Sequence, residues 1–364
     1  MTLSHRTSLA VLAGLLLSAC SPATESQVEH TEVAAEETVT NAEPVVNSGT
    51  VNLYSSRHYD TDLALYTDFT EQTGIEVNRI EANANALIER MVSEGEFSPA
   101  DLLITVDAGN LWRADEAGIL APLESDVLEA RIPDYLRHPE GKWFGLSKRG
   151  RVIIYNKESV SPEGLENYAD LADPAYNGMV CMRSSGNIYN ISLLSSQIEH
   201  NGAEAAEAWA QGVVDNFARR PQSNDSGQIE AVASGECGIS VVNTYYLARY
   251  ARSDDPQRVE IYNSLGVIFP DQDGNGTHVN ISGAALAKHA PNRENAVLFL
   301  EYLTSPSAQA YFANGNNEYP VTSDAPESSA VATLGTFTED DLNVSTFGPN
   351  QTAAIEVFDR VGWQ

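Results

Sequence analysis

Apolar and polar positions follow two different spacings once the chain passes residue 50. Short apolar runs such as residues 51–55 and 101–106 are typical of strands. Leu63, Tyr66 and Phe69 instead recur at the spacing of one helix face, in a helix that ends before a glycine. Strand–helix units of this length predict an α/β fold, in which mainly parallel sheets are flanked by helices.

The same alternation continues towards the C-terminal end of the chain. Further strands are predicted at residues 75–80, 151–155, 178–182, 238–242, 263–269 and 279–287. Helices are predicted at residues 85–94, 110–117, 189–199, 203–216, 244–252, 292–304 and 307–314. The units form two series joined by strand-like crossings instead of a flexible linker, so we expect two lobes with a ligand cleft between them.

The N-terminal segment reads as an export signal. Arg6 is followed by an apolar stretch over residues 9–17, which is too short to span a bilayer permanently. Leu-Ser-Ala-Cys at residues 17–20 resembles the bacterial lipobox, which implies removal of residues 1–19 and a lipid on Cys20. Acyl chains on Cys20 would hold the protein at a membrane. An ordinary cleaved signal with an incidental cysteine is the alternative.

Composition separates a tether from the folded part. Residues 20–48 are rich in Glu, Thr, Ser, Val and Ala and contain no aromatic residue, so we expect a flexible acidic tether. The whole chain of 364 residues carries 51 acidic and 21 basic residues, a formal net charge of −30. Nucleic acids and anionic lipids are bound by basic patches, so this charge argues against both as partners.

Two cysteines remain beyond the signal segment. Cys181 and Cys237 lie on or beside predicted strands of the same half of the chain. Outside the cytoplasm such a pair is compatible with a disulfide, and two buried free thiols are the alternative.

Tyrosines follow three of the predicted strands. Tyr59 comes after His58 in S-S-R-H-Y-D, Tyr189 lies in S-S-G-N-I-Y-N, and Tyr245 and Tyr246 lie in V-V-N-T-Y-Y. In an open α/β sheet the carboxyl ends of the strands line the ligand crevice. Phenolate is a hard oxygen donor, and a small trivalent ion such as Fe³⁺ has the charge to displace the phenol proton. Together the positions predict a ferric-iron site, although each tyrosine alone is more typical of half-buried packing.

Other acidic positions carry weaker signals. Glu81 and Asp107 also follow strands, where helix capping or solvent exposure accounts for them. The stretch D-Q-D-G-N-G at residues 271–276 resembles half of a calcium loop, but Ser282 stands where an EF-hand needs a bidentate Glu. We interpret that stretch as a β-hairpin turn.

Four segments resemble the ferric-iron-binding proteins of bacterial ABC transporters, in particular their FutA-like branch. The segments are S-S-R-H-Y-D-T-D, S-K-R-G-R-V-I-I-Y-N-K, S-S-G-N-I-Y-N and N-T-Y-Y-L-A-R-Y. The resemblance covers nearly all of residues 49–364 and implies a two-lobed type II periplasmic-binding-protein fold. The implied first lobe comprises residues 49–146 and 276–326, and the implied second lobe comprises residues 147–275 and 327–364.

The resemblance also implies a set of iron ligands, with one pair from the first lobe and three tyrosines from the second. These ligands are His58, Tyr59, Tyr189, Tyr245 and Tyr246. In the family a water or an anion can stand in place of the histidine. In some members an arginine lies behind the ligands, which by motif is Arg149, and Arg57 and Arg249 are further candidates because four phenolates leave an iron site negatively charged.

We therefore expect a periplasmic lipoprotein, monomeric and anchored through Cys20, that captures Fe³⁺ by hinge closure. It would deliver the ion to an inner-membrane ABC permease, with a synergistic anion or water completing the coordination. The sequence contains no P-loop, no G-x-S-x-G elbow and no H-E-x-x-H, and we do not expect an enzyme. Two alternatives stay open, namely the same fold with a polyamine or small oxyanion as ligand, and an anchored metallohydrolase.

Overall fold

The structure is a computed structural model that describes residues 48–364, with the exception of residues 58, 223 and 326–328. The predicted signal peptide, the predicted lipid-attachment residue Cys20, the predicted tether up to residue 47 and the predicted ligand His58 lie outside the described residues. All elements discussed below belong to one compact unit of the chain, Pro44–Gln364.

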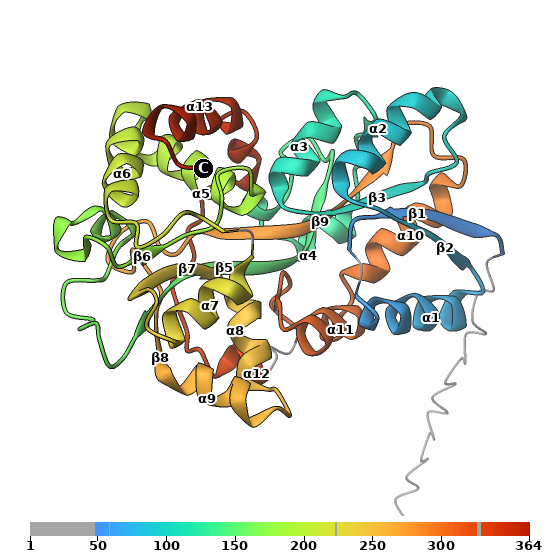
Figure 1. Cartoon of the computed structure of the whole chain (residues 1–364). Helices are drawn as coiled ribbons and strands as arrows, with labels where there is room; N and C mark the ends of the chain where they lie inside the picture. Colours follow the sequence, from blue (N-terminus) through green and yellow to red (C-terminus); the bar gives the residue numbers. More distant parts are fainter. Residues whose placement is uncertain (1–47, 58, 223, 326–328) are drawn as a thin grey trace, which may run out of the picture. The chain divides into compact units, whose positions relative to one another are not determined.

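A mixed β-sheet runs through this unit (Figure 1). Its strands are β1 (Thr50–Ser55), β2 (Glu76–Glu81), β3 (Leu102–Val106), β4 (Leu120–Ala121), β5 (Phe144–Asn156), β6 (Val180–Cys181), β7 (Ile239–Asn243), β8 (Leu265–Ile268), β9 (Val279–Ala287) and β10 (Tyr319–Pro320). The main path has the order β2-β1-β3-β9-β5-β7-β6, while β8 and β10 pair with β5 and β4 pairs with β9.

The direction of pairing divides these strands into two kinds. At the two ends of the path the pairs are parallel, β1 with β2 and β3, and β6 with β7. Every pair that includes β5 or β9 is antiparallel. The α/β fold is as predicted, and the parallel pairs are those expected from strand–helix repeats. The antiparallel pairs come from two strands that cross between the halves.

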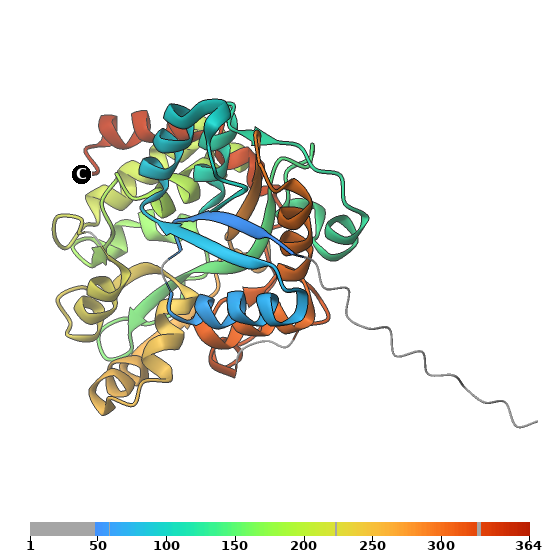
Figure 2. The same cartoon turned by 90° about the vertical axis from the view of Figure 1, so that its right-hand side faces the viewer.

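Helices cover both faces of the sheet (Figures 1 and 2). They are α1 (Thr61–Thr73), α2 (Ala84–Glu94), α3 (Ala108–Glu116), α4 (Asp126–Arg131), α5 (Ile188–Asn201), α6 (Ala203–Asp215), α7 (Asp225–Ala233), α8 (Thr244–Ala251), α9 (Pro256–Ser264), α10 (Arg293–Leu303), α11 (Pro306–Asn316), α12 (Ser329–Ala332) and α13 (Gln351–Val361). Periodicity did not predict α4, α7, α9, α12 or α13. In the part of the chain that the structure describes, no helix combines the length and apolar character needed to cross a bilayer.

Strand β5 joins the two halves of the sheet as one continuous backbone. Its residues 144–150 pair with β9, and its residues 151–156 pair with β7 and β8. Most of its side chains are buried, which explains the apolar run that predicted part of it at residues 151–155. The strand extends further towards the N-terminus than predicted, because Gly and charged residues there interrupt the apolar run.

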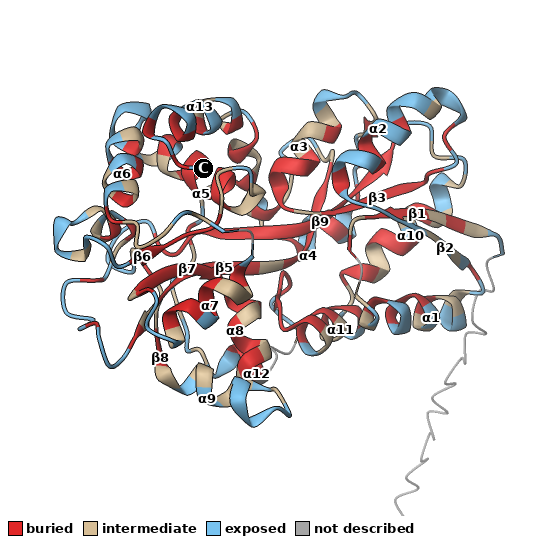
Figure 3. Cartoon of the chain, in the orientation of Figure 1, coloured by how far each residue is buried: buried red, intermediate tan, exposed pale blue. Residues whose placement is uncertain are grey.

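Buried apolar side chains form three main clusters, and buried residues make up most of the strands (Figure 3). The first apolar cluster includes Leu53, Leu103 and Phe299, from strands and helices near the N-terminal part and the β9–α11 region. The second packs α5, α6 and α13 around β7, and the third packs α7 and α8 against β5. The segment 327–364, expected in the second lobe, contributes Val344 and Phe347 to the first cluster and the α13 residues to the second.

The turn after β8 is not the hairpin that we expected from its D-G and N-G pairs. Strand β8 pairs with β5 at Ile153–Asn156, and β9 pairs with β5 from Gly150 downwards. Strands β8 and β9 therefore lie end to end along β5 instead of side by side, and the turn between them projects from the sheet. Turn-forming residues specify a reversal, but the apolar pattern of β5 decides where the flanking strands pair.

Cys181 at the end of β6 and Cys237 before β7 form a disulfide, with Cα atoms 5.9 Å apart. Both cysteines are buried. Of the two states that the sequence left open, the structure has the bonded one.

Candidate metal centre

Tyr189 is placed by the start of α5. Asn187 caps this helix, and its side chain accepts a hydrogen bond from the backbone nitrogen of Tyr189 at 3.1 Å. The hydroxyl of Tyr189 lies 3.3 Å from the hydroxyl of Tyr245. Two phenol oxygens this close occupy one small region, as two donors to the same ion must.

Tyr245 and Tyr246 lie in the first turn of α8, which begins directly after β7. Successive helix residues point about 100° apart, yet the two rings lean together with centroids 4.4 Å apart and planes tilted by 31°. Tyr245 is buried, and Tyr246 also packs against the third apolar cluster. Both rings lie beside the side chain of Arg249, which belongs to the same helix.

Tyr59 reaches the same region from the segment after β1. The guanidinium carbon of Arg249 lies 5.3 Å from the ring centroid of Tyr59, 5.1 Å from that of Tyr245 and 5.5 Å from that of Tyr246. Arg249 is thus a common neighbour of three of the predicted ligands, and the fourth, Tyr189, contacts Tyr245. The structure brings all four tyrosines together, and we call them the tyrosine cluster.

Two of the predicted arginines are buried beside the tyrosine cluster. The guanidinium of Arg149 lies 5.4 Å from the ring of Tyr189, and neither of its terminal nitrogens has a hydrogen-bond partner among the described residues. Arg57 lies 4.9 Å from the ring of Tyr59 and forms ion pairs with Asp62 at 3.0 Å and Glu318 at 2.9 Å. Arg57 therefore serves mainly to neutralise a buried acidic pair behind Tyr59.

Sequence reasoning missed two further arginines and their partner. Arg183 lies 5.0 Å and Arg151 5.9 Å from the ring of Tyr189, and both form ion pairs with the buried Asp225, at 3.0 and 3.2 Å. Asp225 also accepts a hydrogen bond from the backbone nitrogen of Asn243, just ahead of α8. The sequence offered one weak signal for Arg183, namely that it follows a predicted strand as Tyr59 and Tyr189 do.

Burial favours the protonated form of Tyr59, Tyr189 and Tyr245 by raising the pKa of each. It raises the pKa of Tyr189 to about 12, and it also raises the pKa of Tyr59 and, further still, that of Tyr245. Arg149 opposes the effect at Tyr189, and Arg57 and Arg249 oppose it at Tyr59. Phenols in this state bind a metal only when the ion displaces their protons, so the cluster favours an ion of high charge.

The charges around the cluster favour an anionic occupant or anionic phenolates. Four of the arginines are paired with carboxylates: Arg57, Arg149, Arg151 and Arg183. Within the described residues, Arg249 forms no ion pair with a carboxylate, and it lies against three rings of the tyrosine cluster. A positive charge held among phenols stabilises their ionised form once their protons leave.

Other donor groups do not gather in the same way. Among the described residues, no group of three or more His, Cys, Asp or Glu side chains is arranged to hold a metal ion. Glu81 pairs with Arg79 at 2.8 Å and retains exposure to solvent, whereas Asp107 is fully buried.

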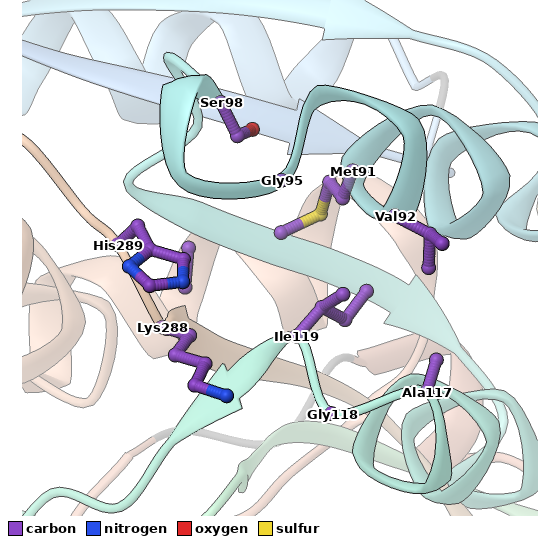
Figure 4. A pocket seen from close by; sticks show the side chains of 10 residues that line it. Met91, Val92, Gly95, Ser98, Ala117, Gly118, Ile119, Lys288 and His289 are labelled. Carbon is purple, nitrogen blue, oxygen red and sulfur yellow. The ribbon is translucent and has the colours of Figure 1, made fainter.

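Two cavities are lined by residues outside the tyrosine cluster. One of about 170 Å³ is bordered by Met91, Ile119, Lys288 and His289 (Figure 4). A larger one of about 650 Å³ lies between α3 on one side and the start of α5 and α13 on the other. The larger cavity separates elements that belong to the first and second apolar clusters.

Comparison with known proteins gives a family and several relatives. Residues 64–339 match the family described as bacterial extracellular solute-binding protein. Iron uptake protein A1 of Synechocystis sp. is 47% identical over 363 residues, which cover 100% of this chain and 97% of that protein. Iron uptake protein A2 of the same organism is 48% identical over 319 residues, or 87% of this chain and 91% of that protein.

Solved structures show the same fold. The Trichodesmium protein IdiA, also called FutA, in complex with iron and citrate ligands, superposes with a TM-score of 0.85 at 54% sequence identity. That match covers 87% of this chain and 100% of the Trichodesmium chain.

Proposed function

The chain belongs to the family of bacterial extracellular solute-binding proteins, and we propose that its solute is ferric iron, captured outside the cytoplasm and delivered to an ABC permease. Such a protein is not an enzyme, because it binds and releases its solute without making or breaking a covalent bond. The relatives named for iron uptake match nearly the whole length of the chain, which supports the same cargo here.

One observation carries the proposal. Phenol groups from three separate segments meet at one place, linked by the contact of Tyr189 with Tyr245 and by the shared neighbour Arg249. Packing alone does not require three tyrosine rings to lie around one arginine with a fourth tyrosine in hydroxyl contact, and buried polar groups normally have a defined partner. Ferric iron is a partner that matches both the hardness and the number of these donors.

The ligands in this proposal are the tyrosine cluster together with His58, or a water or anion in its place. Four phenolates contribute four negative charges against three positive charges on the ion, so the site carries a net charge of about −1. Arg249 and Arg149 are placed to balance that charge, and the hydrogen-bonding capacity left on Arg149 supports a role in donating to a phenolate or to a bound anion. Arg57 acts behind Tyr59.

Capture would occur by closure of two lobes, residues 49–146 with 276–326 and residues 147–275 with 327–364. Tyr59 belongs to the first lobe and the other three tyrosines belong to the second, so each lobe alone offers an incomplete set of ligands. Strand β5 connects the lobes as continuous backbone, and the chain crosses again just before β9, so we propose that the hinge lies in β5 and in the segment that leads into β9. Metal would favour the closed state because only that state supplies all ligands.

The setting in the cell is part of the same proposal. Cleavage before Cys20 and lipid on its thiol would anchor a monomeric protein to a bacterial membrane, with residues 20–48 as the tether. The family places the protein outside the cytoplasm, and the periplasm is the compartment in which it would meet an inner-membrane permease.

The test is a titration of metal-free protein with ferric citrate, followed by visible absorption. Tyrosinate bound to Fe³⁺ absorbs visible light, so we expect an orange to red band that saturates at one iron per protein and bleaches with dithionite. A polyamine such as spermidine, or a small oxyanion, would produce no band. A protein that stays colourless in excess ferric citrate would overturn the proposed function.

A further inference from the structure

Asp107, the residue after β3, has a backbone conformation that side chains rarely adopt. Its φ is 80° although it is not a glycine, and its side chain is fully buried. Residues held in such conformations persist only where their surroundings determine them, and they concentrate at ligand clamps and switch regions. Capping of α3 explains one of its contacts but does not explain the others.

Three elements donate hydrogen bonds to the Asp107 carboxylate, and a fourth supplies an ion pair. Oxygen Oδ1 accepts hydrogen bonds from the Ser192 hydroxyl at 2.6 Å and from the Gly109 backbone nitrogen at 3.0 Å. Oxygen Oδ2 accepts one from the Asn280 side chain at 3.0 Å and lies 3.5 Å from the Arg149 guanidinium. The donors come from α5, α3 and β9 and the ion-pair partner comes from β5, so one carboxylate connects strands β5 and β9 with helices α3 and α5.

The bond to Ser192 crosses between the two halves of the protein. Asp107 leads into α3, whose Leu111 lies in the first apolar cluster. Ser192 belongs to α5, whose Leu193 and Leu194 lie in the second. Closing the protein therefore brings the Ser192 hydroxyl to the carboxylate, and opening it withdraws the hydroxyl and admits water.

Polar contacts join the halves beside the larger cavity. Gln351 of α13 donates a second crossing bond to the carbonyl oxygen of Gly109 at 2.9 Å. The cavity of about 650 Å³ is lined by Asn110 and Trp112 on one side and by Ile191 and Gln351 on the other. Because a cavity replaces apolar contacts in that part of the interface, individual hydrogen bonds contribute a large part of the stability of the closed arrangement there.

The same carboxylate is linked to the tyrosine cluster by two routes. Ser192 follows Tyr189 by three residues in α5, so the two side chains lie on neighbouring turns of one helix face. Arg149 lies against the ring of Tyr189 and pairs with Asp107. Holding Ser192 and Arg149 in place therefore holds Tyr189 in its position.

We propose that Asp107 is the closing residue of this protein: its bond to Ser192 keeps the two halves together and sets how long ferric iron stays bound. The inference rests on the proposed function, since it concerns retention of the same cargo. Asp107 touches no ligand oxygen in this scheme and acts as a positioning residue, through Ser192 and Arg149.

The test compares Ser192→Ala with Ser195→Ala. Both serines are fully buried in α5, but Ser195 has no hydrogen-bond partner among the described residues and so provides a matched control. Each protein is loaded with ferric citrate and mixed with excess EDTA, and loss of the visible band is followed. Hydrogen bonds to charged groups make contributions that correspond to about 10- to 100-fold in an equilibrium, so we expect Ser192→Ala to release iron about 10- to 100-fold faster than the control.

Two further readouts separate closure from coordination and folding. The wavelength of the band should be the same in both variants, because no ligand is removed, and the metal-free variants should unfold at the same temperature. Equal release rates would overturn the role of Asp107 while leaving the proposed function intact, and so would faster release that comes with a lower unfolding temperature. An uncoloured wild-type protein would overturn both.

Discussion

At the scale of single residues, the central feature is that buried tyrosines lie close together in their neutral, protonated form. Tyr189 and Tyr245 face each other at 3.3 Å as neutral groups whose pKa burial raises. The neighbouring arginines can stabilise the phenolates once these form, but they do not deprotonate the phenols in the absence of metal. Ionisation is therefore coupled to arrival of a cation, which makes the cluster selective for highly charged ions.

Replacing Tyr189 by Phe removes one donor oxygen while keeping the ring. We expect Tyr189→Phe to shift or abolish the visible band and to lower ferric affinity by more than about 100-fold, since even outer contacts of a metal site are worth 10- to 100-fold. The control is Tyr250→Phe in α8, whose hydroxyl bonds to Glu230 away from the cluster. Retention of the full band and affinity in Tyr189→Phe would exclude this residue from the site.

At the scale of elements, the turn between β8 and β9 shows how packing overrides local preference. Its residues favour a reversal, and a hairpin was the natural expectation. Strands β8 and β9 instead take consecutive stretches of the same partner, β5. Asp271 within the turn has φ 60° and accepts a hydrogen bond from the backbone nitrogen of Tyr168. The hydrogen bond holds the turn against the body of the protein, but it places the Asp271 carboxylate where its ionised form is unfavourable.

The unfavourable ionisation of Asp271 predicts that Asp271→Asn increases folding stability by an amount that depends on pH. Burial, with the nearby charges of Asp170 and Asp340, raises the pKa of Asp271 to about 6, above the value of about 3.9 in an unfolded chain. The folded state then binds the proton more tightly, so this group favours folding below pH 4 and loses that contribution as pH rises through 6.

Asparagine tolerates the positive φ and keeps an acceptor, so it should behave as the protonated acid does. We expect Asp271→Asn to be more stable than wild type at pH 7.5, by no more than about 1 kcal/mol because the group is partly solvated, and equal to it near pH 4. Urea unfolding at both pH values measures this, with the exposed Asp273→Asn as control. A gain of the same size at both pH values would contradict the electrostatic explanation.

At the scale of the whole molecule, iron binding is coupled to proton release from tyrosines that belong to distant segments of the chain. Tyr59 and Tyr245 come from segments far apart in the chain, and both have a raised pKa. Each phenol that becomes a ligand must give up one proton when the halves close. Binding therefore competes with protons at every ligand, and the competition is strongest in acid.

We expect ferric affinity to rise with pH between pH 5 and 7, by about a factor of 10 per pH unit for each phenol that loses its proton. Competition with a chelator of known protonation measures the affinity, and dye absorbance in weak buffer counts the protons released. Tyr189→Phe should release one proton fewer than wild type. An affinity independent of pH would show that the phenols are not the ligands.

Much of this architecture could be predicted because it depends on local signals. Apolar runs and helix-face spacing placed β1, β3, β7 and β9 and the helices that follow them, and Asn187 and Asn243 mark the starts of α5 and α8. The tyrosine positions were recognisable because they follow strand ends, where crevices form. Arg151, Arg183 and Asp225 were missed, because an ion pair between distant segments leaves no periodic trace in the sequence.

The amino-acid sequence by itself determined most of the strands, many of the helices and the residue types of the candidate site, since each of these depends on neighbours within a few positions. Only the tertiary structure decided which donors meet: the contact of Tyr189 with Tyr245, the arginines around Tyr189, and the bond from Ser192 to Asp107. Such meetings depend on the path of β5 and β9 and on the burial that these strands impose. Short-range patterns carry no information about distances in space between segments so far apart in the chain.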